Sequence, residues 1–249
     1  MLRILTLLIF ICMFNKAAAQ DTYLNSGSIT FEKKVNMYAL IRKYNNLEDG
    51  MMKEAFAQYQ RSHSQFRLQR STLKFSANKT LFVPAPDSGA SDFMSRHPLV
   101  HQNNTIYTDL DKHSYVCQKN VYDKIYLVSD TTRRIQWKIT SEKREIAGYQ
   151  CRRANALIMD SVYVVAFYTD EIQISGGPES FTGLPGMILG LAFPHDNVSW
   201  FATSVDLAAI PAVTITPPVK GKAIDIAGLQ QYIISDGTKN KATLRWFFL

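Results

Sequence analysis

The strongest constraint on the fold is a period-two alternation of apolar and polar residues, which recurs through most of the chain between residues 64 and 205. It is clearest in Ile135-Gln136-Trp137-Lys138-Ile139-Thr140, where the apolar side chains fall on odd positions. Strands with this pattern bury one face and expose the other. The links between them are short, which favours antiparallel neighbours over crossover helices. The sequence therefore predicts a mainly-β fold built on a curved antiparallel sheet or half-barrel.

One helix is expected before these strands, over Leu47–Tyr59, with Asn46 as its N-cap. Its apolar residues share one helical face, and they are Leu47, Met51, Met52, Ala55, Phe56 and Tyr59. The opposite face is polar, so we expect the helix to pack on the sheet with one side in water. Met51 and Met52 suit a soft apolar pocket, although core packing is the commoner use of methionine. The fold class is thus α+β, mainly β with one or two helices.

Residues 1–19 have the three parts of a secretory signal peptide. Arg3 supplies the positive start, Ile4–Phe14 is almost purely apolar, and Ala17-Ala18-Ala19 is a cleavage site. The apolar run is too short to span a bilayer as a helix. We therefore expect residues 20–249 to be exported as a single domain without a transmembrane segment. Its destination would be the periplasm, the outer membrane or the medium.

Removal of residues 1–19 leaves two cysteines, Cys117 and Cys151. An even number of cysteines in an exported chain favours a disulfide, and we expect these two to form one. The alternative is a pair of buried free thiols, since unpaired cysteine is among the most buried residue types.

The segment Thr169–Leu191 contains two tight bends before an apolar stretch. Gly176-Gly177-Pro178 is the first. Leu184-Pro185-Gly186-Met187 is the second, and its proline and glycine positions predict a type II turn. Glycine and proline supply backbone shape rather than chemistry, so a buried corner that closes a sheet is one interpretation of this segment.

This segment resembles the signature of the GLPGLI family, exported proteins of Gram-negative bacteria whose function is undefined. The matching residues are Gly183, Leu184, Pro185, Gly186, Met187 and Ile188, with Met187 where leucine is usual. Trp137–Ile139, Ile146–Ala154 and Phe167–Ile172 are similar to further stretches of the family pattern. The resemblance covers about residues 115–200 and implies export, but no activity, cofactor or catalytic residue.

The sequence offers no clear catalytic or metal-binding pattern. It has no G-x-S-x-G motif, and no glycine loop suited to phosphate. His97 and His101 have the spacing of metal ligands on a helix, but Pro98 and the surrounding loop argue against a helix there. A metal site of these two with Asp109 or Asp111 is an alternative, and His113 with Cys117 repeats the spacing. A nucleophilic Cys151 beside Arg152 and Arg153 is a further alternative. We expect no catalytic site, metal or cofactor, and an exported hydrolase or metal-dependent enzyme would need at least two of His97, His101, His113 and His195 to converge.

Basic residues gather in one predicted hairpin of a chain whose net charge is +7. They are Arg133, Arg134, Lys138, Lys143, Arg144, Arg152 and Arg153, against Glu142 and Glu145. Such a face suits anionic headgroups, lipopolysaccharide phosphates or an acidic protein, or it is an ordinary wet face. Nucleic acid is not expected as a partner, because no recognisable reader motif is present.

These features lead us to expect a non-enzymatic, exported cell-envelope protein. It would bind a lipid or other apolar or amphiphilic ligand, or dock on an outer-membrane protein. Besides the enzyme considered above, the alternative is a scaffold subunit of an outer-membrane transport complex.

Overall fold

The computed structural model describes residues 25–45, 47–86, 97–101, 103–121, 124–235 and 245–248. Its strands are β1 (Ser26–Asn36), β2 (Phe66–Ser76), β3 (Lys79–Pro84), β4 (Thr105–Asp109), β5 (Ser114–Val121), β6 (Lys124–Thr131), β7 (Lys138–Ile146), β8 (Tyr149–Ile158), β9 (Val162–Thr169), β10 (Met187–Phe193), β11 (Val198–Asp206) and β12 (Lys222–Ile224). Its helices are α2 (Met37–Tyr44), α3 (Gly50–Ser62), α4 (Pro98–His101) and α5 (Ile226–Ser235). Short 3-10 helices are η2 (Pro194–Asp196), η3 (Ala212–Thr214) and η4 (Arg245–Phe248). The signal peptide predicted over residues 1–19 lies outside the described residues.

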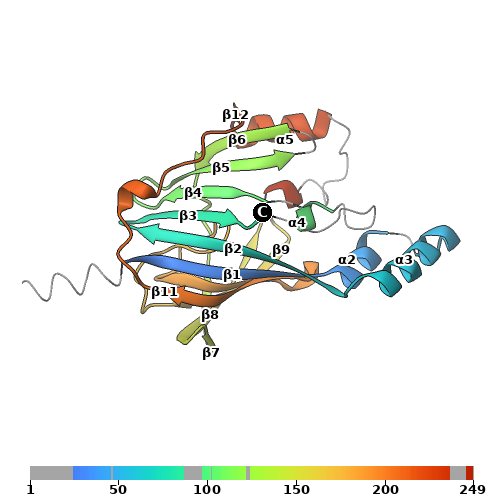
Figure 1. Cartoon of the computed structure of the whole chain (residues 1–249), viewed down its shortest axis with the longest axis horizontal. Coiled ribbons are helices and arrows are strands. Elements are labelled where there is room, and N and C mark those ends of the chain that lie inside the picture. The colour runs from blue at the N-terminus through green and yellow to red at the C-terminus, as the bar shows by residue number, and fades with distance from the viewer. Residues whose placement is uncertain are drawn as a thin grey trace, which may run out of the picture.

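All the strands belong to one 12-stranded sheet, in the order β12-β6-β5-β4-β3-β2-β1-β11-β10-β9-β8-β7 (Figure 1). Every neighbouring pair is antiparallel except β12 and β6, which are parallel. The prediction of a mainly-β fold on an antiparallel sheet is confirmed. The finer prediction of a half-barrel is not confirmed. The sheet is open, with β12 and β7 as its edge strands.

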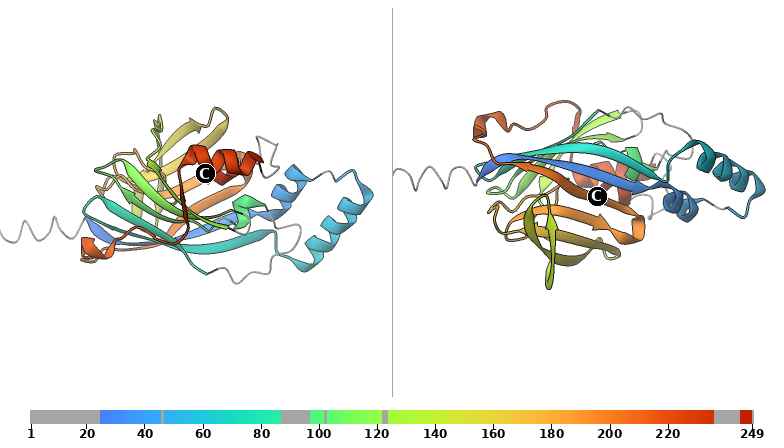
Figure 2. Two further views of the ribbon diagram at one scale, coloured as in Figure 1. Left: turned by 90° about the horizontal axis from the view of Figure 1, so that it is seen from above. Right: turned by 60° about the horizontal axis from the view of Figure 1, so that its bottom comes forward.

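The core lies on one face of the sheet. In β1, the alternate residues Ile29, Phe31, Lys33 and Val35 are all buried, so they point to the covered side. That side is covered in part by α5, whose Leu229 and Ile233 are fully buried and which lies across the sheet in Figure 2. Nearly every residue of β9 and β10 is buried, which places both faces of these two strands under cover.

The predicted helix exists as α3, but it begins at Gly50 and is capped by Asp49, whose side chain accepts from the Met51 amide. It projects beyond the end of the sheet with α2 (Figure 1). Its buried residues Phe56 and Tyr59 meet Tyr38 of α2, with ring centroids 5.9 and 6.4 Å away. The expectation that this helix packs on the sheet is therefore wrong, and so is a core place for Met51, which is 79% exposed. Met52 is half-buried, and Asn46 lies outside the described residues.

The predicted disulfide is not formed: Cys117 and Cys151 are both free and buried. Cys117 lies in β5 and Cys151 in β8, with β4, β3, β2, β1, β11, β10 and β9 between them in the sheet. A disulfide needs Cα atoms within about 7 Å of one another, less than the width of two strand spacings. The alternative of two buried thiols applies instead.

None of the described helices is long and apolar enough to cross a bilayer.

Candidate functional site

The GLPGMI signature forms a buried corner between β9 and β10. Leu184, Met187 and Ile188 are buried, and the backbone of Gly186 presses on the end of β9. A Cβ at Gly186 would lie 2.0 Å from the Thr169 carbonyl oxygen, and the φ of Gly186 is +148°. Only glycine fits such a close approach.

The turn at this corner differs from the predicted type II turn. The Gly186 amide donates to the Leu184 carbonyl at 2.8 Å, which makes a three-residue turn around Pro185. A type II turn would direct the Met187 amide to Leu184, but that amide donates to the Ile172 carbonyl at 3.0 Å. Pairing with Ile172 therefore replaces the four-residue turn.

Two further hydrogen bonds fix the signature against its surroundings. The Trp137 indole N–H donates to the Thr182 carbonyl, and the Gly183 amide donates to the Ser175 hydroxyl, both at 2.9 Å. The corner thus acts as a brace for the segment that runs from β9 to β10. This agrees with the interpretation of the signature as shape rather than chemistry.

The braced segment presents one buried acid, Glu179. The turn that carries it is closed by a bond from the Phe181 amide to the Pro178 carbonyl, 3.3 Å long. Glu179 has a φ of +55°, a left-handed conformation that is uncommon outside glycine. Its side chain is nevertheless buried, and its Oε2 accepts from Asn104 Nδ2 at 3.1 Å. Strained backbone around a buried acid is typical of positions with a specific role.

Two lysines are buried near this acid. Lys33 comes from β1 and Lys119 from β5, and each is 5% exposed. Lys119 Nζ donates to the Phe247 carbonyl at 2.7 Å, while Lys33 Nζ lies 5.1 Å from the centre of the Trp200 ring. With Asn104, which precedes β4, and Glu179, they bring four polar side chains from four parts of the chain into the core.

Burial sets the electrostatics of this cluster. Desolvation raises the pKa of Glu179, and it is opposed by the charge of Lys33, the hydrogen bond from Asn104 and the charge of Lys119. Desolvation likewise lowers the pKa of Lys119, against the charges of Cys117 and Glu179. Both shifts favour the uncharged forms of the acid and the amine.

The cluster adjoins two small cavities, each of about 10 Å³. Both are lined by Lys33, Glu179 and Trp200. The first also touches Asn104 and Trp246. A cavity of this size holds about one water molecule, so neither admits a substrate or a lipid.

The basic residues predicted to share one hairpin face are divided by the fold. Arg133 is turned inward, with its Nη2 donating to the Phe248 carbonyl at 2.6 Å and its guanidinium 5.5 Å from the Phe181 ring centre. Arg153 pairs with Glu142 at 2.6 Å. The exposed members are Arg134, Lys138, Lys143, Arg144 and Arg152. The prediction is therefore wrong for Arg133, because its guanidinium donates a hydrogen bond to the Phe248 carbonyl instead of facing solvent.

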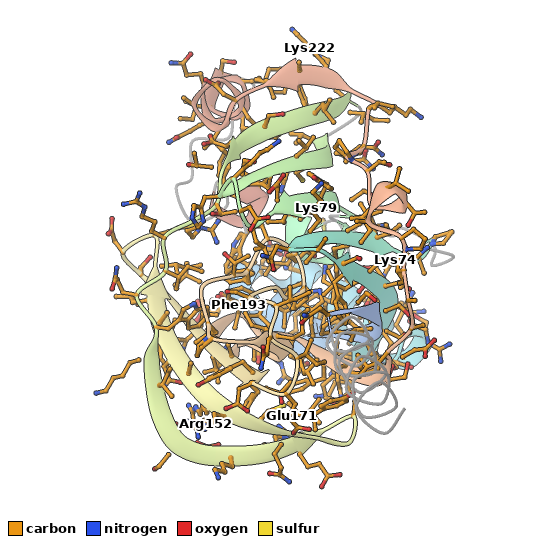
Figure 3. All side chains as sticks on the ribbon, turned by 90° about the vertical axis from the view of Figure 1, so that its left-hand side faces the viewer. Lys74, Lys79, Arg152, Glu171, Phe193 and Lys222 are labelled. Atoms are coloured by element: carbon orange, nitrogen blue, oxygen red, sulfur yellow. The ribbon has the colours of Figure 1, made fainter. Side chains whose placement is uncertain are left out.

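The β7–β8 ribbon carries most of these exposed charges. Figure 3 shows Arg152 on this ribbon, with Phe193 in the interior of the molecule. Lys143 and Arg152 are directly opposite each other on the paired strands. Arg144 turns to the other face, where its guanidinium lies 4.9 Å from the Phe201 ring centre. None of these three forms an ion pair with the described part of the chain.

The histidines whose side chains the structure describes do not come together in one site. His97 packs on Tyr44, with ring centroids 4.5 Å apart, whereas His113 is exposed in the β4–β5 turn and His195 lies near Tyr163 in η2. The side chain of His101 lies outside the described residues. Within the described ranges, no group of three or more His, Cys, Asp and Glu residues could hold a metal ion. Cys151 has a pKa raised to about 12 by burial first and the charge of Glu171 second, which leaves its thiol unreactive.

Sequence reasoning missed the buried cluster of Lys33, Asn104, Lys119 and Glu179. One signal was available: Lys33 occupies an inward position of the β1 alternation, between Phe31 and Val35. Asn104 and Glu179 lie outside regular elements, so no periodicity indicated that their side chains are buried.

A family described as "Protein of unknown function (Porph_ging)" matches residues 157–190, which span β9 and the corner. The matched segment includes the whole signature from Gly183 to Ile188. It covers well under half of the chain. The chain is similar to this family over that segment.

Two solved structures share the fold. One is "Structure of PNGF-II in C2 space group", with a TM-score of 0.53 and 15% identity. The other is "Structure of PNGF-II in P21 space group", with a TM-score of 0.52 and 16% identity. Each match covers 84% of this chain and 33% of PNGF-II, so the chain spans about a third of that protein. No curated protein matches the chain.

Proposed function

We propose that this protein is an exported, non-enzymatic component of the cell envelope that docks on an outer-membrane protein. The contact surface is the β7–β8 ribbon, and the partner supplies an acidic, extended segment. The observation that carries this proposal is a free sheet edge that bears basic side chains without ion pairs in the described part of the chain.

The edge itself supports strand addition. β7 has a strand neighbour on one side only, and residues 138–145 are exposed apart from the half-buried Thr140. An exposed edge offers unpaired backbone N–H and C=O groups, which an extended peptide can pair with. Main-chain pairing of this kind supplies affinity without a preformed pocket.

The charges support an acidic partner. Lys143 and Arg152 face each other across the ribbon, and like charges in directly opposite positions destabilise a strand pair. A carboxylate placed between them would relieve this repulsion. We therefore expect the interaction to weaken as salt increases, because exposed charges are screened over about 8–10 Å near physiological ionic strength.

The interior gives less support to the other candidates. The two cavities beside the polar cluster, among the described residues, hold about one water molecule each, so they do not support a lipid carried at this place. An amphiphile would have to bind at the surface. For a hydrolase or metal enzyme, the described histidines do not converge.

Export is part of the same proposal. It rests on the signal peptide expected over residues 1–19, with cleavage after Ala19. Kinship with the exported GLPGLI family is also proposed, on the signature of residues 183–188.

The test is retention of outer-membrane proteins on the immobilised full chain, with bound proteins identified by mass spectrometry. A double variant, Lys143→Glu with Arg152→Glu, should lose the retained outer-membrane protein. The control is Lys53→Glu with Lys74→Glu, which makes the same change of charge at exposed positions on α3 and β2 and should retain it. Equal retention by both variants would contradict the proposal.

A parallel assay separates protein from lipid. The chain is sedimented with vesicles of phosphatidylglycerol or of phosphatidylcholine at physiological salt. Binding to the anionic vesicles that is lost in the Lys143→Glu, Arg152→Glu variant would identify a membrane surface instead, and would overturn the protein partner.

A further inference from the structure

The buried cluster contains the three groups needed to join a lysine to an asparagine. Lys33 provides an amine, Asn104 a carboxamide, and Glu179 an acid that already bonds to that carboxamide at 3.1 Å. All three line the same cavity, and all three are less than 9% exposed. Phe181, Phe193, Trp200 and Trp246 line it as well, so the surroundings are apolar.

Lys33 and Asn104 line one cavity although β1 and β4 are separated in the sheet by β2 and β3. Lys33 on β1 is paired in register with Gln69 on β2. The Gln69 side-chain amide donates to the side-chain carbonyl of Asn103, the residue before Asn104. This contact holds the segment before β4 against β2, next to the β2 residue that pairs with Lys33.

We propose that Lys33 and Asn104 form an intramolecular isopeptide bond, with Glu179 as the proton-transfer residue. The bond would link β1 to the segment before β4 through the core. It requires no metal, cofactor or enzyme, because every reacting group belongs to this chain.

The reaction releases ammonia from the Asn104 side chain. Proton transfer from Lys33 to Glu179 leaves a neutral amine, and Nζ attacks Asn104 Cγ while the Glu179 carboxyl protonates Oδ1. Glu179 then moves the proton of Nζ to Nδ2, the Cγ–Nδ2 bond breaks, and ammonia leaves as the carbonyl reforms. The products are one secondary amide, one ammonia and the regenerated carboxyl. No electron is gained or lost overall.

The environment favours each part of this step. An apolar site disfavours separated charges, so the neutral amine and acid are the preferred pair. The raised pKa of Glu179 agrees with an acid that holds its proton. The adjoining cavity of about 10 Å³ has room for one water-sized molecule such as ammonia.

Asn104 itself supplies a second observation. Its Oδ1 is buried and makes no hydrogen bond within the described structure, and an unsatisfied buried acceptor is unfavourable. The two ends of a carboxamide exchange places by a half-turn of the side chain, so the same geometry presents Oδ1 to a protonated Glu179. That contact polarises the carbonyl for attack.

Lys119 is the competing amine. Its Nζ is engaged with the Phe247 carbonyl at 2.7 Å, and it lines neither of the two cavities. Lys33 lines both. The geometry therefore assigns the attack to Lys33.

The experiment is a tryptic map of the unfolded, purified full chain. A Lys33–Asn104 bond gives a branched peptide that contains both regions, has no cleavage after Lys33, and is lighter than its two parts by one ammonia. Sequencing this peptide by tandem mass spectrometry locates the bond. A loss of ammonia in the intact mass does not identify the bond, because an N-terminal glutamine such as Gln20 also loses ammonia when it cyclises.

Variants assign the roles. Glu179→Gln keeps the shape of the acid but cannot relay the proton. Lys33→Arg replaces the amine with a guanidinium that stays protonated and is not acylated. Both variants should therefore give unlinked peptides in place of full linkage. Lys34→Arg changes the exposed neighbour of Lys33 and should stay fully linked. Wild type without the branched peptide overturns the proposal, and so does a branch at Lys119. Linkage that persists in Glu179→Gln would overturn the role of Glu179.

Discussion

Asn104 donates to the Glu179 carboxylate at 3.1 Å inside the core, and this bond connects the start of β4 with the segment that the GLPGMI corner braces. The partners lie 75 residues apart in the chain. The corner therefore does more than close the β9–β10 connection, because it fixes the backbone that holds Glu179 in its left-handed conformation. The signature and the buried cluster form one structural unit.

A covalent link between Lys33 and Asn104 should raise the free energy of unfolding. A cross-link that closes a loop of about 70 residues is expected to contribute about 4 kcal/mol through the unfolded state. Glu179→Gln should therefore lower the free energy of unfolding in urea by about that amount, and Lys33→Arg should give a similar loss. The control Lys34→Arg should match the wild type. Equal urea midpoints for wild type and Glu179→Gln would contradict the link.

The close contact at the corner predicts a large effect of a single methyl group. Gly186→Ala places Cβ 2.0 Å from the Thr169 carbonyl oxygen at a positive φ, and we expect it to cost at least about 2–3 kcal/mol. Gly148→Ala is the matched control, since Gly148 has a φ of +85° but no atom within 4 Å of the added Cβ. Its cost should be only about 1 kcal/mol. Urea unfolding measures both, and equal losses would show that the close contact is unimportant.

The outcome for these residues shows what alternation in the sequence can predict. The period-two pattern identified strands such as β1 and β8, because one face of each meets the core and the other is more exposed. The clearest alternation, over residues 135–140, instead begins before β7, and nearly all of β7 is exposed. The pattern gave no information on which strands are neighbours, so the distance between Cys117 and Cys151 was not predictable. The helix over Leu47–Tyr59 was recognised, but its apolar face proved to meet Tyr38 of α2 rather than the sheet. The apolar face of a helix shows that it is buried, but not which other element it packs against.

The site was less predictable than the fold for a physical reason. Glu179 and Asn104 are placed by long-range hydrogen bonds and by backbone strain, not by a repeating pattern. The basic residues were recognised as a group, yet Arg133 faces inward because the Phe248 carbonyl, far away in the sequence, accepts its hydrogen bond. Such contacts arise only once the sheet is assembled.

The two cysteines should be inert while the protein is folded. Burial is the first cause that raises the pKa of Cys117 to about 11 and that of Cys151 to about 12, and the thiolate is the reactive form. After removal of residues 1–19, we expect no reaction with a thiol reagent at pH 8 in buffer and two thiols per chain in denaturant without reductant. Fewer than two in denaturant would reveal a disulfide.

His97 should make stability depend on pH. Desolvation first, and the charge of Lys43 second, lower its pKa from 6.5 to about 4 in the folded state. Its ring is held between Tyr44 and Trp246, with centroids 4.5 and 6.0 Å away, and its Nδ1 accepts from the Leu99 amide at 3.2 Å. The unfolded chain takes up a proton below pH 6.5, whereas the folded chain does so only near pH 4.

The stability that neutral His97 provides is therefore present above pH 6.5 and is lost as the pH falls from 6.5 toward 4. The loss amounts to at most about 3.5 kcal/mol, since one pKa unit corresponds to about 1.4 kcal/mol. His97→Asn keeps an acceptor for the Leu99 amide but does not titrate, so its unfolding free energy in urea should fall less over this range. The difference between the two proteins removes the contribution of Glu179, whose raised pKa acts in the opposite direction. Parallel curves for the two proteins would show that His97 is protonated equally in both states.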